Sequence, residues 1–528
     1  MKVKPFKSVI KFSIGLAVVL LVSACHNPNE SKNTIYSVEE VELYNVAADE
    51  EVVIDHNTEE YDRIYENAFK EAKQNPLSTF SIDVDNASYS NVRRFLNNNQ
   101  LPPKDAVRIE EMINYFNYDY PQPTDKHPFS FSNEVADCPW NTEHKLVHIG
   151  IQGKSLDYND LKPSNFVFLI DASGSMSSND KLPLLKKGLK LLLSELNEND
   201  KVAIVAYAGS AGLVLPSTKA SKKEKIIRAL DRIESGGSTA GGQGIQLAYN
   251  IAKENLIANG NNRVILATDG DFNVGMSSSS ELVRLIEEKR KEDIYLTICG
   301  FGMGNYKDGR MEQISNAGNG NYFYIDNIKE AKKVFSTDMR TNMFTIAKDV
   351  KIQIEFNPKQ VKAYRLIGYE NRLMNDEDFN DDKKDAGELG AGHTVTALYE
   401  VVLSNSTENI SKHDPLKYQK TESTRASKTD ELLTIKFRYK KPKQDESILI
   451  TNTIVDEGVK LELTSNNFRF SSAVAGFGLL LRDSNYKGNI TYAMVEELAS
   501  KAKGDDINGY RQDFINMLET SSLLAEKY

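Results

Sequence analysis

Residues 165–176 read NFVFLIDASGSM, in which a continuous apolar run passes directly into an aspartate and two serines. An apolar run of this length, bounded by turn residues, is typical of a buried parallel strand. Residues 263–270, RVILATDG, repeat the arrangement and end at a second aspartate. Predicted strands and helices alternate over residues 164–345. This alternation predicts an α/β fold with a doubly wound, mostly parallel sheet.

The regions on either side have different patterns. Residues 77–152 combine an alternating, strand-like segment with two helix-like segments, which predicts a small N-terminal module. Residues 346–528 contain several strand-like runs between loops rich in Asn, Asp and Lys, and they become helical from about Ile490. We therefore predict a β-rich C-terminal module that ends in helices. Residues 146–151 form another strand-like run, and we expect this strand to complete the C-terminal sheet.

The N-terminus has the pattern of an export signal. Residues 1–24 combine a basic start with a short apolar run and end in small residues, directly before Cys25. Such a segment is a cleaved signal peptide rather than a transmembrane helix. Its end resembles the bacterial lipobox, whose cysteine receives acyl chains such as palmitate. We therefore expect Cys25 to anchor the mature chain in a cell-envelope membrane. His26 follows in place of the aspartate that retains lipoproteins in the inner membrane, which favours the outer membrane where one exists.

The composition narrows the class of protein. The chain has 528 residues, 40% of them hydrophobic, and a formal net charge of −10. The apolar share is sufficient for sizeable cores, whereas the negative charge argues against nucleic acid as a partner. Beyond the N-terminal segment no run is long and apolar enough for a membrane span, which excludes a polytopic transporter. Residues 25–76 are acidic and lack apolar periodicity, so we predict an acidic, flexible tether.

Three short motifs in the α/β region predict a metal site. Asp171, Ser173 and Ser175 follow the first strand at the spacing of a loop that curls around an ion, and Asp269 follows the second strand. Thr239 adds a hydroxyl group from the glycine-rich GGSTAGG loop. These oxygen ligands suit Mg²⁺, with Mn²⁺ or Ca²⁺ as alternatives. Ligands of doubly wound sheets bind outside the carboxyl ends of the strands, so the loops converge if the two strands are neighbours at the switch point.

The same motifs resemble the metal-ion-dependent adhesion site (MIDAS) of von Willebrand factor type A (VWA) domains. That site combines D-x-S-x-S, a distant threonine and a T-D-G aspartate, and all its positions match here: Asp171, Ser173, Ser175, Thr239 and Asp269. The resemblance implies a VWA fold over the α/β region. It also implies a bound divalent cation with an open coordination position that a carboxylate of a partner fills.

The flanking sequences resemble a bacterial family of lipoproteins with such a domain. The phrases that resemble its N-terminal segment are STFSIDVDNASYSNVRRFL (78–96), VRIEEMINYF (107–116) and CPWN (138–141). The phrases that resemble its uncharacterised C-terminal domain are YRLIGYENR (364–372) and GAGHTVTALYE (390–400). Membership of this family implies a fold and a metal site, but it does not identify the ligand that binds at that site.

These patterns favour a membrane-anchored envelope protein that binds a protein partner through the metal site, in adhesion or another protein–protein interaction. The alternative is an envelope assembly or structural factor that acts through its C-terminal module, with the metal site only stabilising the fold. Truncation after about residue 345 should distinguish them, since adhesion would survive it and assembly would not. We expect no enzymatic activity, because no nucleophile beside a general base is evident.

Three other groups of residues have more than one interpretation. Cys138 and Cys299 could pair in an oxidising envelope, but Cys299 ends a predicted core strand, so we expect buried free thiols. Phe272 and Tyr306 lie near the predicted metal loops, where both a ligand rim and core packing suit aromatic side chains. The acidic run 376–382 departs from the EF-hand pattern and is predicted to be a solvated loop.

Overall fold

A six-stranded sheet forms the centre of the α/β region. The computed structural model describes residues 58–82, 85–157, 161–208, 210–237, 241–270, 279–339, 343–410 and 424–526. In spatial order the strands are β10 (Tyr322–Ile325), β9 (Tyr295–Phe301), β8 (Asn261–Thr268), β5 (Ser164–Asp171), β6 (Lys201–Ala208) and β7 (Ser210–Lys219). Neighbours from β10 to β6 are parallel, and β7 is antiparallel at the edge.

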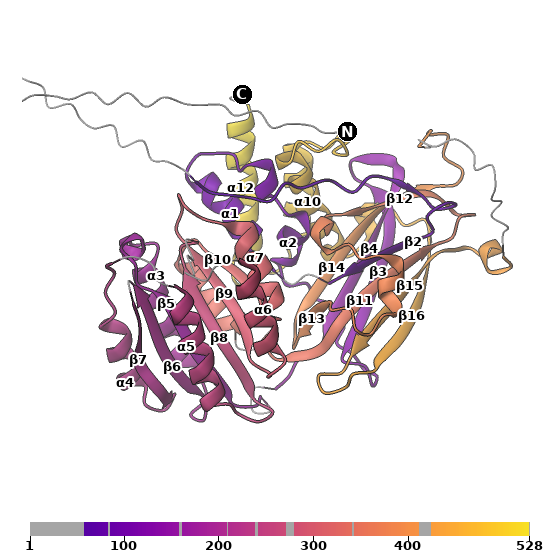
Figure 1. Ribbon diagram of the computed structural model, residues 1–528. Coiled ribbons are helices and arrows are strands. Elements are labelled where there is room, and N and C mark those ends of the chain that lie inside the picture. The colour runs from indigo at the N-terminus through magenta and orange to yellow at the C-terminus, as the bar shows by residue number, and fades with distance from the viewer. Residues whose placement is uncertain are drawn as a thin grey trace, which may run out of the picture. The chain divides into compact units, whose positions relative to one another are not determined.

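Helices cover both faces of this sheet (Figure 1). Phe166, Phe168 and Ile170 of β5 belong to one apolar core, whereas Val167 and Leu169 between them belong to another. The first core also contains residues of α3 (Leu182–Glu195), α4 (Lys223–Asp231), α8 (Ile328–Lys332) and the π-helical turn η4 (Lys333–Asp338). The second contains residues of α5 (Gly241–Glu254), α6 (Ser279–Arg290) and α7 (Asp308–Ala317). Alternate residues of the central strand are thus buried in cores on opposite faces of the sheet, which confirms the predicted doubly wound sheet.

The order of the strands places a switch point between β5 and β8. The chain leaves β5 to form β6 on one side, and it later returns to form β8 on the other side. Ile170 of β5 is paired with Ala267 of β8, so the two strands end at the same level. Asp171 and Asp269 therefore lie at neighbouring strand ends, where doubly wound sheets bind their ligands.

Two antiparallel sheets share a single apolar core beside the α/β region. One has the order β1 (Lys70–Glu71), β12 (Val361–Ile367), β14 (Thr394–Leu403), β4 (Asn141–Gly153) and β3 (Phe129–Cys138). The other has the order β13 (Gly387–Gly390), β11 (Thr345–Phe356), β15 (Glu431–Lys440) and β16 (Ser447–Val455), and β2 (Leu77–Ser81) also pairs with β11. Sheets that pack face to face over one core form a β-sandwich.

The sandwich is assembled from both ends of the chain. Leu146 of β4 lies opposite Glu400 of β14, which confirms that the strand near residue 146 joins the C-terminal sheet. In the second sheet, Phe80 of β2 lies opposite Ile352 of β11. The strands of residues 77–152 thus complete the C-terminal sheets instead of forming a module of their own.

Helices from both ends also pack together. They are α1 (Ala87–Asn97), α2 (Ile109–Asn114), α10 (Asn466–Leu481), α11 (Tyr492–Lys501) and α12 (Tyr510–Ala525). Phe116, just after α2, makes edge-on contacts with Phe470 and Phe514, at centroid distances of 4.9 and 5.8 Å. The predicted C-terminal helices are present, but the helical part starts at α10, before Ile490. None of the helices in the described ranges has both the length and the apolar character needed to cross a membrane.

The tether prediction is wrong for residues 58–76. Glu59 accepts hydrogen bonds of 2.6 and 2.8 Å from the guanidinium group of Arg94, and only 4% of its side chain is exposed. The backbone N–H of Thr58 donates to the carbonyl group of Gly304 at 2.7 Å. Further along, β1 pairs with β12. These contacts fix the segment, because Glu59, the backbone of Thr58 and strand β1, all of which composition assigned to solvent, have specific partners. Residues 1–57, with Cys25, lie outside the described residues.

Candidate metal centre

The first carboxylate, Asp171, is buried at the end of β5 and held from three directions. Its Oδ1 accepts the backbone N–H of Ser173 at 2.9 Å. Its Oδ2 accepts hydrogen bonds from hydroxyl groups of both neighbouring strands. Tyr207 of β6 donates at 3.1 Å and Thr268 of β8 at 3.2 Å. Because a strand on each side supplies a donor, the carboxylate is oriented by the sheet itself.

The charge on Asp171 is disfavoured in the protein. Burial raises the pKa of Asp171, the hydrogen bonds from Ser173 lower it, and the nearby charge of Asp269 raises it again. The net effect is a raised pKa, so the ionised carboxylate is destabilised by its surroundings. Burial also raises the pKa of Tyr207 well above its usual value, so its hydroxyl group stays protonated and remains a donor. A positive charge at this position would relieve the cost of the Asp171 charge.

Two serine hydroxyl groups lie together in the loop after β5. Ser173 Oγ and Ser175 Oγ are 3.0 Å apart, with Ser173 buried and Ser175 exposed. The glycine-rich loop closes on this turn, because Gly236 N donates to Ala172 O at 2.8 Å and Gly174 N donates to Gly237 O at 3.2 Å. The structure thus brings the first two motifs into contact. Thr239 itself lies outside the described residues.

The second carboxylate, Asp269, follows β8 and is fully buried. Its Oδ2 accepts a hydrogen bond of 3.0 Å from the ammonium group of Lys181. Its Oδ1 is buried without a hydrogen-bond partner in the part of the chain that the structure describes. A buried carboxylate oxygen without a partner is costly, so this atom is a candidate metal ligand.

The residues present fit a divalent cation. They offer two carboxylates and two hydroxyl groups, Asp171, Asp269, Ser173 and Ser175, and this all-oxygen set suits Mg²⁺, Mn²⁺ or Ca²⁺ rather than a metal that prefers nitrogen or sulfur. Within the described residues no group of three or more His, Cys, Asp and Glu side chains is placed to hold a metal ion. The candidate centre is therefore one with few anionic ligands, in which hydroxyl groups take part.

Sequence reasoning missed Lys181, the charged neighbour of this centre. The residue stands just before α3, and its contact with Asp269 joins positions 88 residues apart. No local motif marks it, because the contact depends on how the loop after β5 folds back over the end of β8.

Comparison with known families agrees with this architecture. The model described as "von Willebrand factor type A domain" matches residues 165–337, and the model described as "von Willebrand factor" matches residues 55–148. The model described as "Uncharacterized protein YfbK, C-terminal" matches residues 341–524. The chain is 44% identical over 470 residues to "Uncharacterized protein YfbK" of Escherichia coli (strain K12), a match that covers 88% of this chain and 81% of that protein. This chain belongs to the YfbK family.

Other matches of this YfbK-family chain are more partial. "Uncharacterized protein sll0103" of Synechocystis sp. is 25% identical over 208 residues, which covers 39% of this chain and 47% of that protein. Among solved structures, the von Willebrand factor type A protein from Catenulispora acidiphila matches with a TM-score of 0.41 and 15% identity, over 76% of this chain and 92% of that chain.

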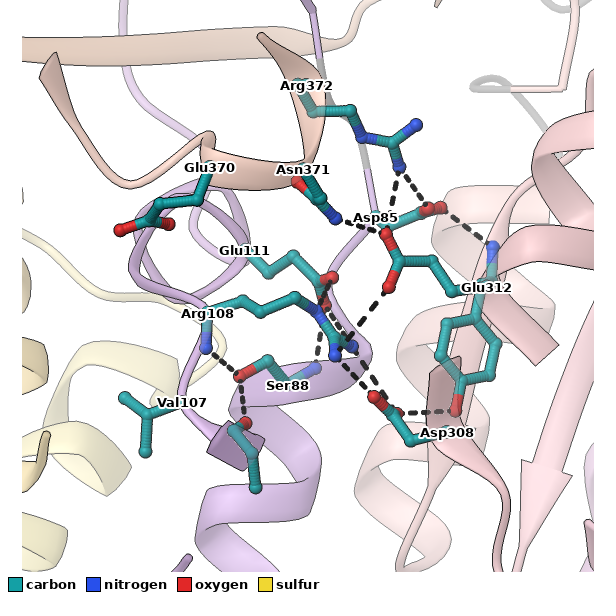
Figure 2. Close-up of polar contacts among 12 residues, drawn as sticks. Asp85, Ser88, Val107, Arg108, Glu111, Asp308, Glu312, Glu370, Asn371 and Arg372 are labelled. Carbon is teal, nitrogen blue, oxygen red and sulfur yellow. Dashed lines mark hydrogen bonds and ion pairs between the residues drawn. The ribbon is translucent and has the colours of Figure 1, made fainter. Parts of the chain in front are cut away.

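A second polar cluster, also missed by sequence reasoning, joins the three matched regions of this YfbK-family chain (Figure 2). Arg108, before α2, pairs with Glu111 and with Asp308 at the start of α7. Glu312 of α7 lies 3.7 Å from Arg108 and 3.5 Å from Arg372, which follows β12. Both arginines and all these carboxylates are largely buried. The cluster therefore ties the VWA domain to the N-terminal and C-terminal parts by ion pairs.

The other residues named from the sequence have simpler roles. Tyr306 is fully buried, and its ring contacts Tyr324 edge-on at a centroid distance of 4.9 Å, so it is a packing residue. Phe272 lies outside the described residues. Cys138 and Cys299 are free and buried, as expected. Burial raises the pKa of both thiols, so neither side chain is a reactive thiolate.

Proposed function

We propose that this chain is a lipid-anchored protein of the cell envelope that binds a protein partner through a divalent cation in its VWA domain. The cation, Mg²⁺ or else Mn²⁺ or Ca²⁺, would be held by Asp171, Ser173, Ser175, Thr239 and Asp269. The observation that carries the proposal is Asp269 Oδ1, a buried carboxylate oxygen without a partner, at the switch point where Asp171 and the two serines converge. This oxygen and the raised pKa of Asp171 both favour a cation here.

Each residue has a separate task in this proposal. Asp171 supplies charge and is held in place by Tyr207 and Thr268. Ser173 and Ser175 supply neutral oxygens, so few negative charges surround the site. When bound, the cation supplies an open coordination position for a carboxylate group of the partner. The exposed position of Ser175 leaves that side of the site accessible to a partner.

A binding role is favoured over catalysis by the surroundings of the serines. Ser173 Oγ is hydrogen bonded to Ser175 Oγ rather than to a general base, and an activated serine nucleophile needs such a base. Cys25 would provide the membrane anchor through its acyl chains, in the outer membrane where the cell has one. Replacement of Cys25 by serine should release the chain from the membrane fraction, whereas retention there would contradict the anchor.

The metal-dependent part is tested with purified full-length protein. We expect Mg²⁺ to bind in isothermal titration calorimetry, and we expect immobilised protein to capture an envelope protein in Mg²⁺ but not in EDTA. Asp171→Asn and Asp269→Asn should lose both properties. Asp200→Asn is the matched control, because Asp200 is also a buried aspartate of the VWA domain but accepts backbone N–H groups of Ser164 and Asn197. Equal capture in EDTA, or by Asp171→Asn, would contradict the proposal.

The alternative, assembly through the C-terminal part, needs a different test from the one suggested by the sequence. Truncation after residue 345 would remove β11 and β14, the strands that pair with β2 and β4. The remaining strands would lose their sheets and their core, so loss of partner capture would report unfolding. Point variants at Asp171 and Asp269 keep every strand of the sandwich, so we expect the sandwich to remain folded. Capture that survives those variants would favour the assembly role.

A further inference from the structure

Lys181 is a buried cation at the proposed metal centre. Its side chain is 11% exposed, and its Nζ donates to Asp269 Oδ2 at 3.0 Å. Lysine is seldom buried without an anionic partner, and Asp269 is the carboxylate that the structure pairs with it. The backbone fixes its position, because the carbonyl group of Lys181 accepts the N–H of Leu185 at 2.9 Å where α3 begins. The ion pair is thus a buried, structurally fixed part of the site.

The loop after β9 leaves a space for the stem of this lysine. Gly302 has a φ angle of +71°, and a Cβ atom there would overlap Lys181 Cε. A side chain at this position would displace the lysine from Asp269. The carbonyl group of Gly302 is held by the buried hydroxyl group of Tyr324, so the loop is fixed as well. Glycine is favoured here for two reasons. It leaves room for the lysine stem, and it adopts the positive φ angle without strain.

The ammonium group changes the charge that a metal ion meets. Asp171 and Asp269 together carry two negative charges, and Lys181 compensates one of them while it occupies Oδ2 of Asp269. One oxygen of Asp269 remains without a partner. A divalent cation therefore enters a centre that already contains a positive charge. Since charges interact strongly in buried surroundings, this repulsion must weaken the binding of the metal.

We propose that Lys181 is a resident counter-ion that stabilises the metal-free centre and sets a low affinity for the cation. The inference rests on the proposed metal centre and adds the residue that tunes it. Without metal, the ammonium group stabilises the buried charge of Asp269. With metal, it adds a second positive charge near the partner's carboxylate, which strengthens attraction for an acidic group. The centre would then exchange its cation readily and favour the cation together with an acidic partner.

The test measures Mg²⁺ binding to the full chain and to Lys181→Met, which keeps most of the length of the side chain and removes its charge. We expect Mg²⁺ to bind Lys181→Met at least about tenfold more tightly in titration calorimetry. In EDTA, Lys181→Met should melt at a lower temperature than the parent, because Asp269 loses its counter-ion. In Mg²⁺ this difference should shrink or reverse. Lys190→Met removes the same charge from an exposed ion pair between Lys190 of α3 and Asp231 of α4, and it should change neither property.

Three results would contradict the inference, and a fourth would reject the metal centre on which it rests. If the parent and Lys181→Met bind Mg²⁺ with equal affinity, the metal centre is supported but the proposed role of Lys181 is wrong. If Lys181→Met lowers the melting temperature equally in EDTA and in Mg²⁺, the lysine only stabilises the fold. If Lys181→Arg, which retains the charge, binds Mg²⁺ as tightly as Lys181→Met, the effect comes from packing. No Mg²⁺ binding by either the parent or Lys181→Met would reject the metal centre itself.

Discussion

The hydroxyl group of Tyr207 donates a hydrogen bond of 3.1 Å to Oδ2 of Asp171, between two side chains at the ends of neighbouring strands. Tyr207 is fully buried, and its pKa is raised, so the phenol acts as a neutral donor. The bond both orients the carboxylate and lowers its pKa. The polar end of β6 therefore orients Asp171, the proposed metal ligand, although Tyr207 has no place in the recognised motif.

Tyr207→Phe should weaken the metal centre with a moderate loss of stability. Loss of one buried hydrogen bond to a charged acceptor costs about 1.5–3 kcal/mol, and we expect weaker Mg²⁺ binding because the carboxylate is less well oriented. Urea unfolding in EDTA and Mg²⁺ titration calorimetry measure the two effects. The control is Tyr249→Phe, since the hydroxyl group of Tyr249 is buried in α5 without a hydrogen-bond partner among the described residues. Equal effects of both variants would refute the role of Tyr207.

Arg108→Met should strongly destabilise the protein. The change leaves Glu111 and Asp308 buried without their common cation, and removal of one partner of a buried pair costs about 3–5 kcal/mol. We expect a lower urea midpoint in far-UV circular dichroism. Because the two carboxylates belong to the N-terminal part and to the VWA domain, the transition should also become broader as the parts unfold separately.

Lys104→Met provides the matched comparison for the Arg108 variant. Lys104 lies shortly before Arg108 and forms an ion pair with Asp483. The side chain of Lys104 is 62% exposed and that of Asp483 is 61% exposed. Exposed ion pairs contribute about 0–1 kcal/mol, so the urea midpoint should hardly move. A similar loss of stability in both variants would show that the buried cluster has no special importance.

The fold of the VWA domain and its two aspartates could be predicted from the sequence because the signals are local. Each aspartate directly follows a buried apolar run, and the rule for doubly wound sheets brings such strand ends together. Lys181 and the Arg108 cluster could not be predicted in this way. Arg108 and Asp308 are 200 residues apart, and their pairing depends on tertiary packing that no short motif encodes.

Two errors of prediction have definite physical causes. Helix α10 was missed because it is apolar on nearly every side, and a helix buried all round lacks the periodicity of 3.6 residues that reveals an amphipathic one. Residues 58–76 were assigned to the tether because they are acidic, yet the charge of Glu59 is compensated by Arg94. Composition predicts solvation only where such a partner is absent.

The stability of the sandwich should fall as pH rises above neutrality, because of His144 on β4. Burial lowers the pKa of His144, but hydrogen bonds of 2.6 Å to Glu400 and to Glu408 outweigh burial and raise it above the usual 6.5. A raised pKa in a base gives stability that is fully present below the unfolded pKa and lost as pH rises through the folded pKa. Urea unfolding from about pH 6 to about pH 8.5 measures this loss.

His144→Gln should flatten that pH dependence. His148 lies on the same strand, and burial lowers its pKa to about 3, so it stays neutral over the range tested. His148→Gln should therefore keep the slope of the parent protein, whatever its effect on overall stability. If the slope is unchanged in His144→Gln, the pH dependence comes from another group.

Asp171→Asn should separate stability from metal binding. Because the pKa of Asp171 is raised, the ionised carboxylate destabilises the metal-free protein at neutral pH, and asparagine removes that charge at nearly constant volume. In EDTA the loss of that charge should offset part of the cost of removing the acceptor of the Tyr207 and Thr268 hydroxyl groups, so the variant should melt close to the parent. Mg²⁺ at about 100 times its dissociation constant should stabilise the parent by about 2.7 kcal/mol and the variant hardly at all. Thermal melts with and without Mg²⁺ test this, with Asp200→Asn expected to keep the Mg²⁺ shift; a lower melting temperature of Asp171→Asn in EDTA together with an intact shift would contradict the assignment of Asp171 as a ligand.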